Sequence, residues 1–119
     1  MADVIIEDPE RMNLLGLIFG NLIERQLVNP AKRQQFVKLN VTVGVQASEM
    51  KITLVFQRGQ LRVFRGERPE TRTHLRGSLS TLTQLALGKG LFRAVATRQL
   101  SFQGNLLALL RLRSLLSVS

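Results

Sequence analysis

The residues of this sequence that could do covalent chemistry are few and are not grouped. His74 is the only histidine, and no acidic residue lies close to it in the sequence to orient its ring as a general base. Ser78 lacks the second glycine of a nucleophile elbow and is better explained as a helix cap. The acidic residues near the N-terminus fit the positive end of a helix dipole better than a metal cage. We therefore expect no enzyme, no catalytic residue, no metal and no cofactor.

Length and composition favour a folded, non-secreted domain. The chain has 119 residues, of which 45% are hydrophobic, and it has no cysteine. A chain of this length can bury a core as a single domain, residues 1–119. The absence of cysteine excludes disulfides, thiolate zinc sites and a cysteine nucleophile. No hydrophobic run reaches the length of a membrane span, and the acidic start is unlike a signal peptide. We expect a soluble, cytoplasmic protein.

The charge is strongly asymmetric along the chain. Lys and Arg number 17 against 8 Asp and Glu, a net charge of +9, and the last acidic residue is Glu70. The C-terminal part therefore carries only positive charge, and wherever it reaches the surface it should attract nucleic acid, anionic lipid headgroups or a phosphorylated ligand. Solubilising charge spread around a globule is the alternative explanation.

Periodicity predicts three main helices. Asp8-Pro9 is typical of a helix start, and the hydrophobic residues that follow recur on one face over residues 9–27. Asn29-Pro30 ends that helix and allows a short further turn before Phe36. A second helix begins after Gly77-Ser78 and ends at Gly88, and a last helix runs over residues 106–116.

Alternating hydrophobic and polar residues predict five strands. Three of them follow each other as a meander over residues 39–47, 52–56 and 61–65, and two more occupy residues 71–76 and 99–103. Strands and helices in this order are typical of an α+β fold in which helices pack on one sheet.

The last helix is hydrophobic on nearly every side, since only Arg111, Arg113 and Ser114 are polar between residues 106 and 116. A helix of this kind is either buried on all sides or presents hydrophobic surface to something outside its own chain. The candidates are a partner subunit, a membrane surface or a hydrophobic ligand beneath a helical lid.

The C-terminal part of the sequence also resembles a known family. Thr73-His74-Leu75-Arg76-Gly77-Ser78-Leu79-Ser80-Thr81-Leu82, the segment Leu85-Ala86-Leu87-Gly88 and the segment Leu100-Ser101-Phe102-Gln103-Gly104-Asn105-Leu106-Leu107-Ala108-Leu109 follow the order of the sterol carrier protein two (nonspecific lipid-transfer) domain. The resemblance is strongest over residues 71–116. It implies a single domain with a five-stranded sheet, helices on one face, and an apolar tunnel between them that binds acyl chains, sterols or isoprenoid quinone-type lipids.

The resemblance and the hydrophobic pattern together predict the residues of a lipid site. The predicted lipid-binding residues lie on the middle helix, the last strand and the final helix, and they are Leu82, Leu85, Phe102, Leu107, Leu110 and Leu115. Each of them could equally be an ordinary core residue. The predicted contacts to anionic headgroups are the basic residues Arg93, Arg98, Arg111 and Arg113.

We expect the function to be non-catalytic binding or transfer of a hydrophobic ligand, with transient contact to anionic membrane surfaces. Two alternatives stay open at this point. The basic C-terminal half could bind nucleic acid, although Phe64 between Arg62 and Arg65 is the only basic and aromatic cluster. The final helix could instead serve a homodimer.

Overall fold

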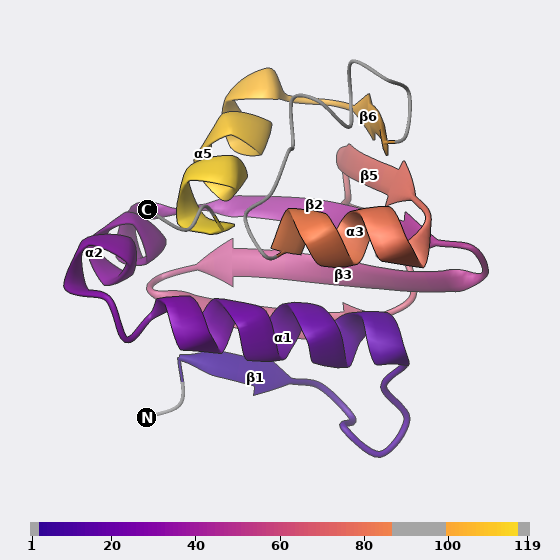
Figure 1. The fold of residues 1–119 in the computed structure, drawn as a ribbon, viewed down its shortest axis with the longest axis horizontal. Coiled ribbons are helices and arrows are strands. Elements are labelled where there is room, and N and C mark those ends of the chain that lie inside the picture. The colour runs from indigo at the N-terminus through magenta and orange to yellow at the C-terminus, as the bar shows by residue number, and fades with distance from the viewer. Residues whose placement is uncertain (1–2, 87–99, 117–119) are drawn as a thin grey trace.

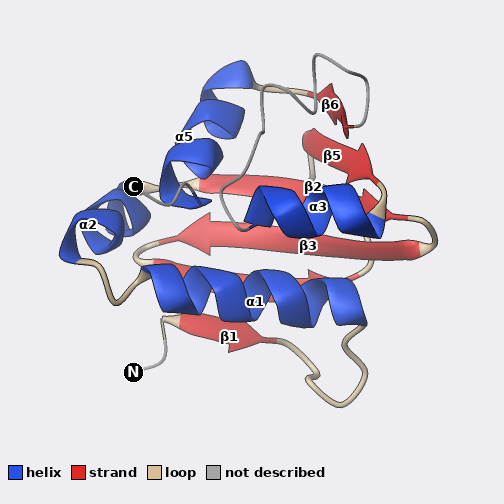
Figure 2. Ribbon diagram, viewed as in Figure 1, coloured by secondary structure: helices blue, strands red, loops and turns tan. Residues whose placement is uncertain are grey.

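The computed structural model describes residues 3–86 and 100–116, which form one sheet with helices against one of its faces (Figures 1 and 2). Helices α1, α3 and α5 lie across that face, and α2 lies at one end of it. The helices are α1 (Leu14–Gln26), α2 (Pro30–Lys38), α3 (Leu79–Ala86) and α5 (Leu106–Leu116). The strands are β1 (Val4–Ile6), β2 (Val41–Ala47), β3 (Met50–Gln57), β4 (Gln60–Arg65), β5 (Thr73–Gly77) and β6 (Leu100–Gln103).

The strand order in the sheet is β1-β4-β3-β2-β5-β6. Strands β2, β3 and β4 form the antiparallel meander that the sequence predicts. Strand β5 joins β2 in parallel, and β6 pairs with β5 antiparallel. The α+β class with helices on one face is therefore confirmed, and the described residues form a six-stranded sheet where five strands were predicted.

The sixth strand is β1, which the sequence reasoning missed. It is only three residues long and pairs in parallel with β4, so Val4 lies opposite Leu61 and Ile6 opposite Val63. Its three successive β-branched or aliphatic residues show no clear alternation, and a short run of this kind carries little periodic signal. Its position in the sheet depends on β4, far along the chain.

The predicted start of the first helix was wrong. Asp8 has a positive φ of 47°, and the backbone N–H of Arg11 donates to its carbonyl oxygen, so the chain turns there. The helix begins at Leu14, where the Asn13 side chain accepts from the N–H of Gly16 at 3.0 Å. Asn13 is a favoured cap residue, and its own amide also donates to the carbonyl of Lys51, which ties the helix start to β3.

The hydrophobic core lies between the sheet and the helices. On β2 and β3 the inward residues Val43, Val45, Ile52 and Leu54 are at most 1% exposed. They pack against a stripe of α1 that includes Phe19, and side chains of α3 and α5 complete the cluster. The alternation of strand side chains sends the residues between them to the opposite, open face of the sheet.

Gly104 sets the angle at which the chain leaves β6 and enters α5. Its φ is +121°, and a Cβ built there would lie 2.6 Å from the carbonyl oxygen of Arg72 and 2.7 Å from the Cα of Thr73. Both contacts are to backbone, which cannot move without displacing β5. Gly66 also has a positive φ, +87°, but a Cβ there would meet nothing within 4 Å.

We expect Gly104→Ala to destabilise the fold by more than Gly66→Ala does. Both changes carry the cost of a positive φ, whereas only the first adds overpacking, which typically costs about 1–3 kcal/mol. Urea unfolding of the two variants measures the difference in free energy. Equal losses in the two variants would show that β5 does not hold this junction.

Candidate functional site

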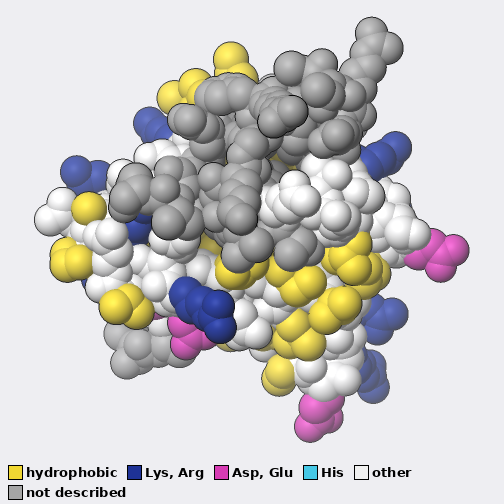
Figure 3. Space-filling model, in the orientation of Figure 1, with side chains coloured by type: hydrophobic (Ala, Val, Ile, Leu, Met, Phe, Trp, Pro, Cys, Tyr) yellow, Lys and Arg dark blue, Asp and Glu magenta, His cyan; other side chains and the backbone are white. Residues whose placement is uncertain are grey.

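Helix α5 has one buried side and one exposed side, and both are hydrophobic. Ala108, Leu112 and Leu115 are 1–4% exposed and pack into the core. On the other side Leu106, Leu107 and Leu110 are 59%, 52% and 37% exposed. We call these last three residues the α5 leucine stripe. Figure 3 shows hydrophobic side chains at the surface of the molecule, some of them at the end of α5.

The six predicted lipid-binding residues do not form one group. Leu82 and Leu115 are fully buried in the core cluster, and Phe102 is partly buried and packs against it. Leu107 and Leu110 belong to the α5 leucine stripe. The side chain of Leu85 lies outside what the structure describes. The separation follows from helix geometry, because residues three and four apart share a face and the others turn away.

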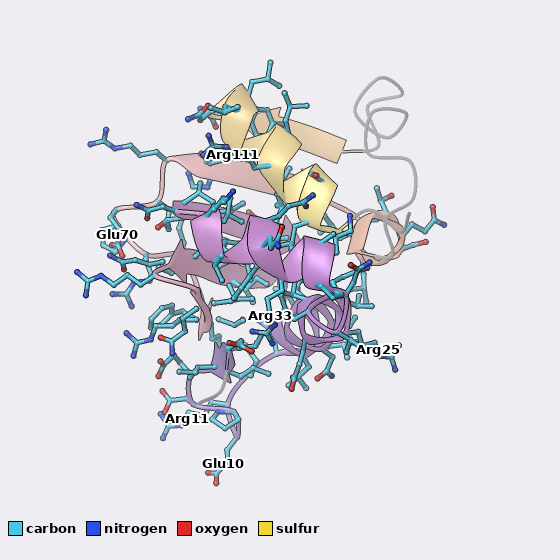
Figure 4. All side chains as sticks on the ribbon, turned by 90° about the vertical axis from the view of Figure 1, so that its left-hand side faces the viewer. Glu10, Arg11, Arg25, Arg33, Glu70 and Arg111 are labelled. Carbon is cyan, nitrogen blue, oxygen red and sulfur yellow. The ribbon has the colours of Figure 1, made fainter. Side chains whose placement is uncertain are left out.

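Of the predicted headgroup contacts, Arg111 is described and exposed on α5. Arg93 and Arg98 lie outside the described residues, as does the side chain of Arg113. Arg111 lies near the top of the view in Figure 4, on the helix that carries the leucine stripe.

The C-terminal end of α5 is held by α2. The Lys32 side chain is 5% exposed, and its Nζ donates to the carbonyl oxygen of Ser114 at 2.5 Å. The last carbonyls of a helix have no partner within the helix and carry its negative dipole end, so a lysine there is favourable. The Ser114 hydroxyl also donates to Oε1 of Gln35 at 3.1 Å. The two contacts fix the distance between α2 and α5.

A hollow of about 280 Å³ lies at this joint, which we call the α2–α5 hollow. Gln35, Lys38, Leu39, Arg111 and Ser114 line it, and its walls are mostly apolar. Lys38 and Arg111 are both exposed, so their stems form walls while their charged ends stay in water. The arrangement joins an apolar surface to two cations, which suits an amphipathic anion. The sequence reasoning found Arg111 but missed Lys38, because nothing in a helical pattern shows which other helix it will face.

The other side of α2 is tied to the N-terminal strand. Nη2 of Arg33 lies 2.6 Å from Oδ2 of Asp3, and this hydrogen bond lowers the pKa of Asp3 below its ordinary value. The same contact raises the pKa of Arg33. Arg33 is thereby engaged with an acid, whereas no acidic side chain within residues 3–86 and 100–116 forms an ion pair with Lys38 or Arg111.

Two residues that the sequence raised as candidates for catalysis, His74 and Ser78, have defined partners in the structure. Glu67 approaches His74, with Oε1 3.3 Å from Nδ1, so an acidic partner that was not expected from the local sequence does exist. Ser78 accepts from the N–H of Thr81 at 3.1 Å, which confirms its role as the cap of α3.

In the described part of the chain, no three metal-ligating side chains come together. Nor is any described helix both long and apolar enough to cross a bilayer.

The fold is similar to several solved structures. "UbiJ-SCP2 Ubiquinone synthesis protein" matches with a TM-score of 0.64 and 17% identity, covering 89% of this chain and 93% of that one. Apo sterol carrier protein 2 from Yarrowia lipolytica matches with a TM-score of 0.58 and 21% identity, covering 84% and 87%. A sec-alkylsulfatase from Pseudomonas sp. matches with a TM-score of 0.64 and 21% identity, covering 73% of this chain but 14% of the enzyme.

A search of curated protein sequences finds no match. The model of the SCP-2 sterol transfer family, however, matches residues 19–117, from the middle of α1 to the end of α5. The match spans most of the sheet, α3 and the helix that carries the leucine stripe, and the solved structures above share the same fold. The chain therefore belongs to the SCP-2 sterol transfer family.

Proposed function

We propose that this protein binds and carries a lipid with an anionic end, and that it does no covalent chemistry. One observation carries the proposal: the α5 leucine stripe lies on the same helix as Arg111, which lines the α2–α5 hollow with Lys38. Membership of a lipid-binding family supports binding or transfer of a hydrophobic molecule in general.

The ligand class follows from the chemistry of these surfaces. Leucine side chains offer no hydrogen bonds, so the part of the ligand they contact is an acyl chain, a sterol-like body or an isoprenoid tail. Each methylene taken out of water contributes about 0.8 kcal/mol. A similar structure is titled a ubiquinone synthesis protein, which keeps isoprenoid quinone-type lipids within this class. The proposal also keeps the apolar tunnel expected from the sequence, for which Leu82, Leu85, Phe102 and Leu115 are the predicted lining residues.

The charged end of the ligand is assigned to Lys38 and Arg111. They line one hollow from two different helices, and the Lys32 contact to α5 holds those helices at a fixed separation. An anionic headgroup bound there would stay hydrated and lie close to both cations. The apolar chain of the same ligand would follow the apolar walls. The same two cations would meet the headgroups of an anionic membrane during loading or release.

Two alternatives came from the sequence, nucleic-acid binding and a homodimer, and a contact in the structure argues against the first. Nucleic-acid binding would need an aromatic ring free for bases to stack on. The Phe64 ring is already covered by Arg68, whose guanidinium carbon lies 4.2 Å from the ring centroid, and Arg62 lies at 5.6 Å. That contact argues against the stacking role. A homodimer through the α5 leucine stripe would bury the same side chains as a lipid and is an outcome of the first test below.

We expect Leu110→Glu to lower the affinity for a fluorescent fatty acid by about tenfold or more, because it places a charge where the ligand's apolar part binds. The fold should persist, since Leu110 is 37% exposed. Far-ultraviolet circular dichroism and fluorescence titration measure the two effects. Leu17→Glu is the matched control, because Leu17 on α1 is 36% exposed and lies outside α5.

Two outcomes would contradict this assignment. Unfolding of the Leu110→Glu variant would show that Leu110 is a core residue. A wild-type dimer that becomes a monomer in this variant, with fatty acid uptake unchanged, would assign the leucine stripe to self-association. Sedimentation velocity on both proteins distinguishes these results.

The double variant Lys38→Gln, Arg111→Gln should bind a fatty acid more weakly than wild type, by roughly tenfold, while its affinity for the corresponding fatty alcohol stays the same. Two cations near an anionic group account for a change of this size. Cosedimentation with phosphatidylglycerol vesicles should fall as well, and should fall with added salt in wild type because charge is screened within about 8 Å at physiological salt.

The matched control is Arg25→Gln, which removes a cation from the exposed surface of α1, away from the hollow (Figure 4). It should leave both affinities unchanged. Equal weakening of fatty acid and fatty alcohol in the double variant would mean that Lys38 and Arg111 shape the site without binding the headgroup.

A further inference from the structure

The open face of the sheet holds a second, polar hollow on the side opposite the helices. Its volume is about 250 Å³, and its lining includes Gly44, Gln46, Lys51, Glu67, His74 and Arg76. We call it the open-face hollow. In Figure 4 helix α1 lies toward the right, where Arg25 is labelled, and nitrogen-tipped side chains project on the left, where Glu70 is labelled.

Strand register places Gly44 beside His74 in the lining of the hollow. Gly44 lies opposite Thr53 on one side and His74 on the other, so the open face lacks one side chain between them. A Cβ added at Gly44 would lie 3.0 Å from Nδ1 of His74 and 3.1 Å from Cγ2 of Thr71. The space directly over Gly44 is therefore taken up by the side chains of His74 and Thr71, and His74 forms part of the lining of the hollow.

The same register places a row of donors along one wall. Lys51 lies opposite Gln46, Gln46 opposite Arg76, and Arg76 opposite Ser101. With neighbouring strands about 4.8 Å apart, the two cations begin about 10 Å apart on either side of Gln46. Their side chains are long enough to reach one small anion between them.

These two cations are not neutralised. Other cations of this face have acidic partners: Arg62 lies 2.8 Å from Glu7, and Arg68 lies 2.8 Å from Glu70 and lowers its pKa. No acidic side chain of residues 3–86 and 100–116 forms an ion pair with Lys51 or Arg76. The one carboxylate of the hollow, Glu67, contacts His74 instead.

We propose that the open-face hollow binds a phosphate monoester group, with Lys51 and Arg76 as its charged ligands. A phosphate monoester carries close to two negative charges and accepts hydrogen bonds from several directions, which matches two separated cations with an amide and a hydroxyl between and beside them. A carboxylate has half that charge and two oxygens in one plane. This site is distinct from the lipid surface, because its side chains leave the sheet on the other face.

Glu67 is the acidic residue in the lining of the hollow, and its negative charge would repel a bound anion. Removing that charge therefore tests the sign of the ligand's charge. Glu67 is 51% exposed at its side chain and lines the hollow, where its carboxylate contacts His74. For an anionic ligand, Glu67→Gln removes a like charge and should raise the affinity. For a cationic or neutral ligand, the same change should lower the affinity or leave it unchanged.

The experiment is an amide-shift titration of the ¹⁵N-labelled full chain with glycerol 3-phosphate at constant pH and ionic strength. We expect saturable shifts confined to β2, β3, β5 and β6 around Gln46, Lys51 and Arg76. Lys51→Gln with Arg76→Gln should weaken binding about tenfold or more, as expected when two charge-assisted hydrogen bonds are lost. Gly44→Ala should weaken it, because the added Cβ would displace the side chains of His74 and Thr71, and Glu67→Gln should strengthen it. Arg25→Gln is the control for net charge and should change nothing.

Two further arms identify the source and class of the anion. Vesicles with phosphatidic acid present the same phosphate monoester as a headgroup, so binding to glycerol 3-phosphate alone indicates a soluble ligand, and binding to both indicates that a membrane can present it. Acetate should bind more weakly. Acetate binding as tight as that of glycerol 3-phosphate, an equal loss in Arg25→Gln, a weaker Glu67→Gln variant or no saturable shift would each overturn the proposal. Fatty acid uptake should be unchanged in the Lys51, Arg76 double variant, so the result is independent of the lipid proposal.

Discussion

The register of β2 against its two neighbours is the constraint on which both candidate sites depend. Side chains alternate along a strand, so the pairing that sends Val43 and Val45 under the helices also sends Gly44 and Gln46 to the open face. A shift of one residue would bury a glutamine and expose two valines. The hydrophobic core therefore fixes the geometry of the polar face as well, and the open-face hollow gains its shape from packing on the other side of the sheet.

The second constraint is the position of α5, which the sheet alone does not determine. Gly104 directs the chain out of β6, Leu112 and Leu115 anchor one side of the helix in the core, and the Lys32 side chain binds its last turn. The leucines that remain outside are exposed because no described segment covers them. A helix held at both ends in this way can present apolar side chains to a ligand while its position on the sheet stays fixed. A carrier of hydrophobic molecules needs this property.

The sequence predicted most elements well where the signal was local and periodic. The meander, β5, β6 and the α5 bounds follow from alternation and helical spacing, and Ser78 was identified as a cap from its type and position. The prediction failed where a distant segment decided the outcome: β1 exists because β4 is beside it, and the first helix starts at Asn13 because that side chain also contacts β3. The lipid residues were chosen by type, and type cannot separate Leu112, which is buried, from Leu110, which is not. Lys38 was missed for a similar reason, since its relation to Arg111 is purely spatial.

The uneven charge of the sequence has a structural explanation. Every acidic residue lies in the first 70 positions, and in the described structure those that form ion pairs contact Arg33, Arg62, Arg68 and His74. Four of the eight acids, Asp3, Glu7, Glu67 and Glu70, form these pairs, and in the described structure no acid pairs with Arg76 or Arg111. These two arginines lie on opposite faces of the molecule, and each shares its hollow with one lysine from the earlier part of the chain. Each of these two separate hollows thus contains positive charge without an acidic partner among the described residues, and anions are the ligands that such charge selects.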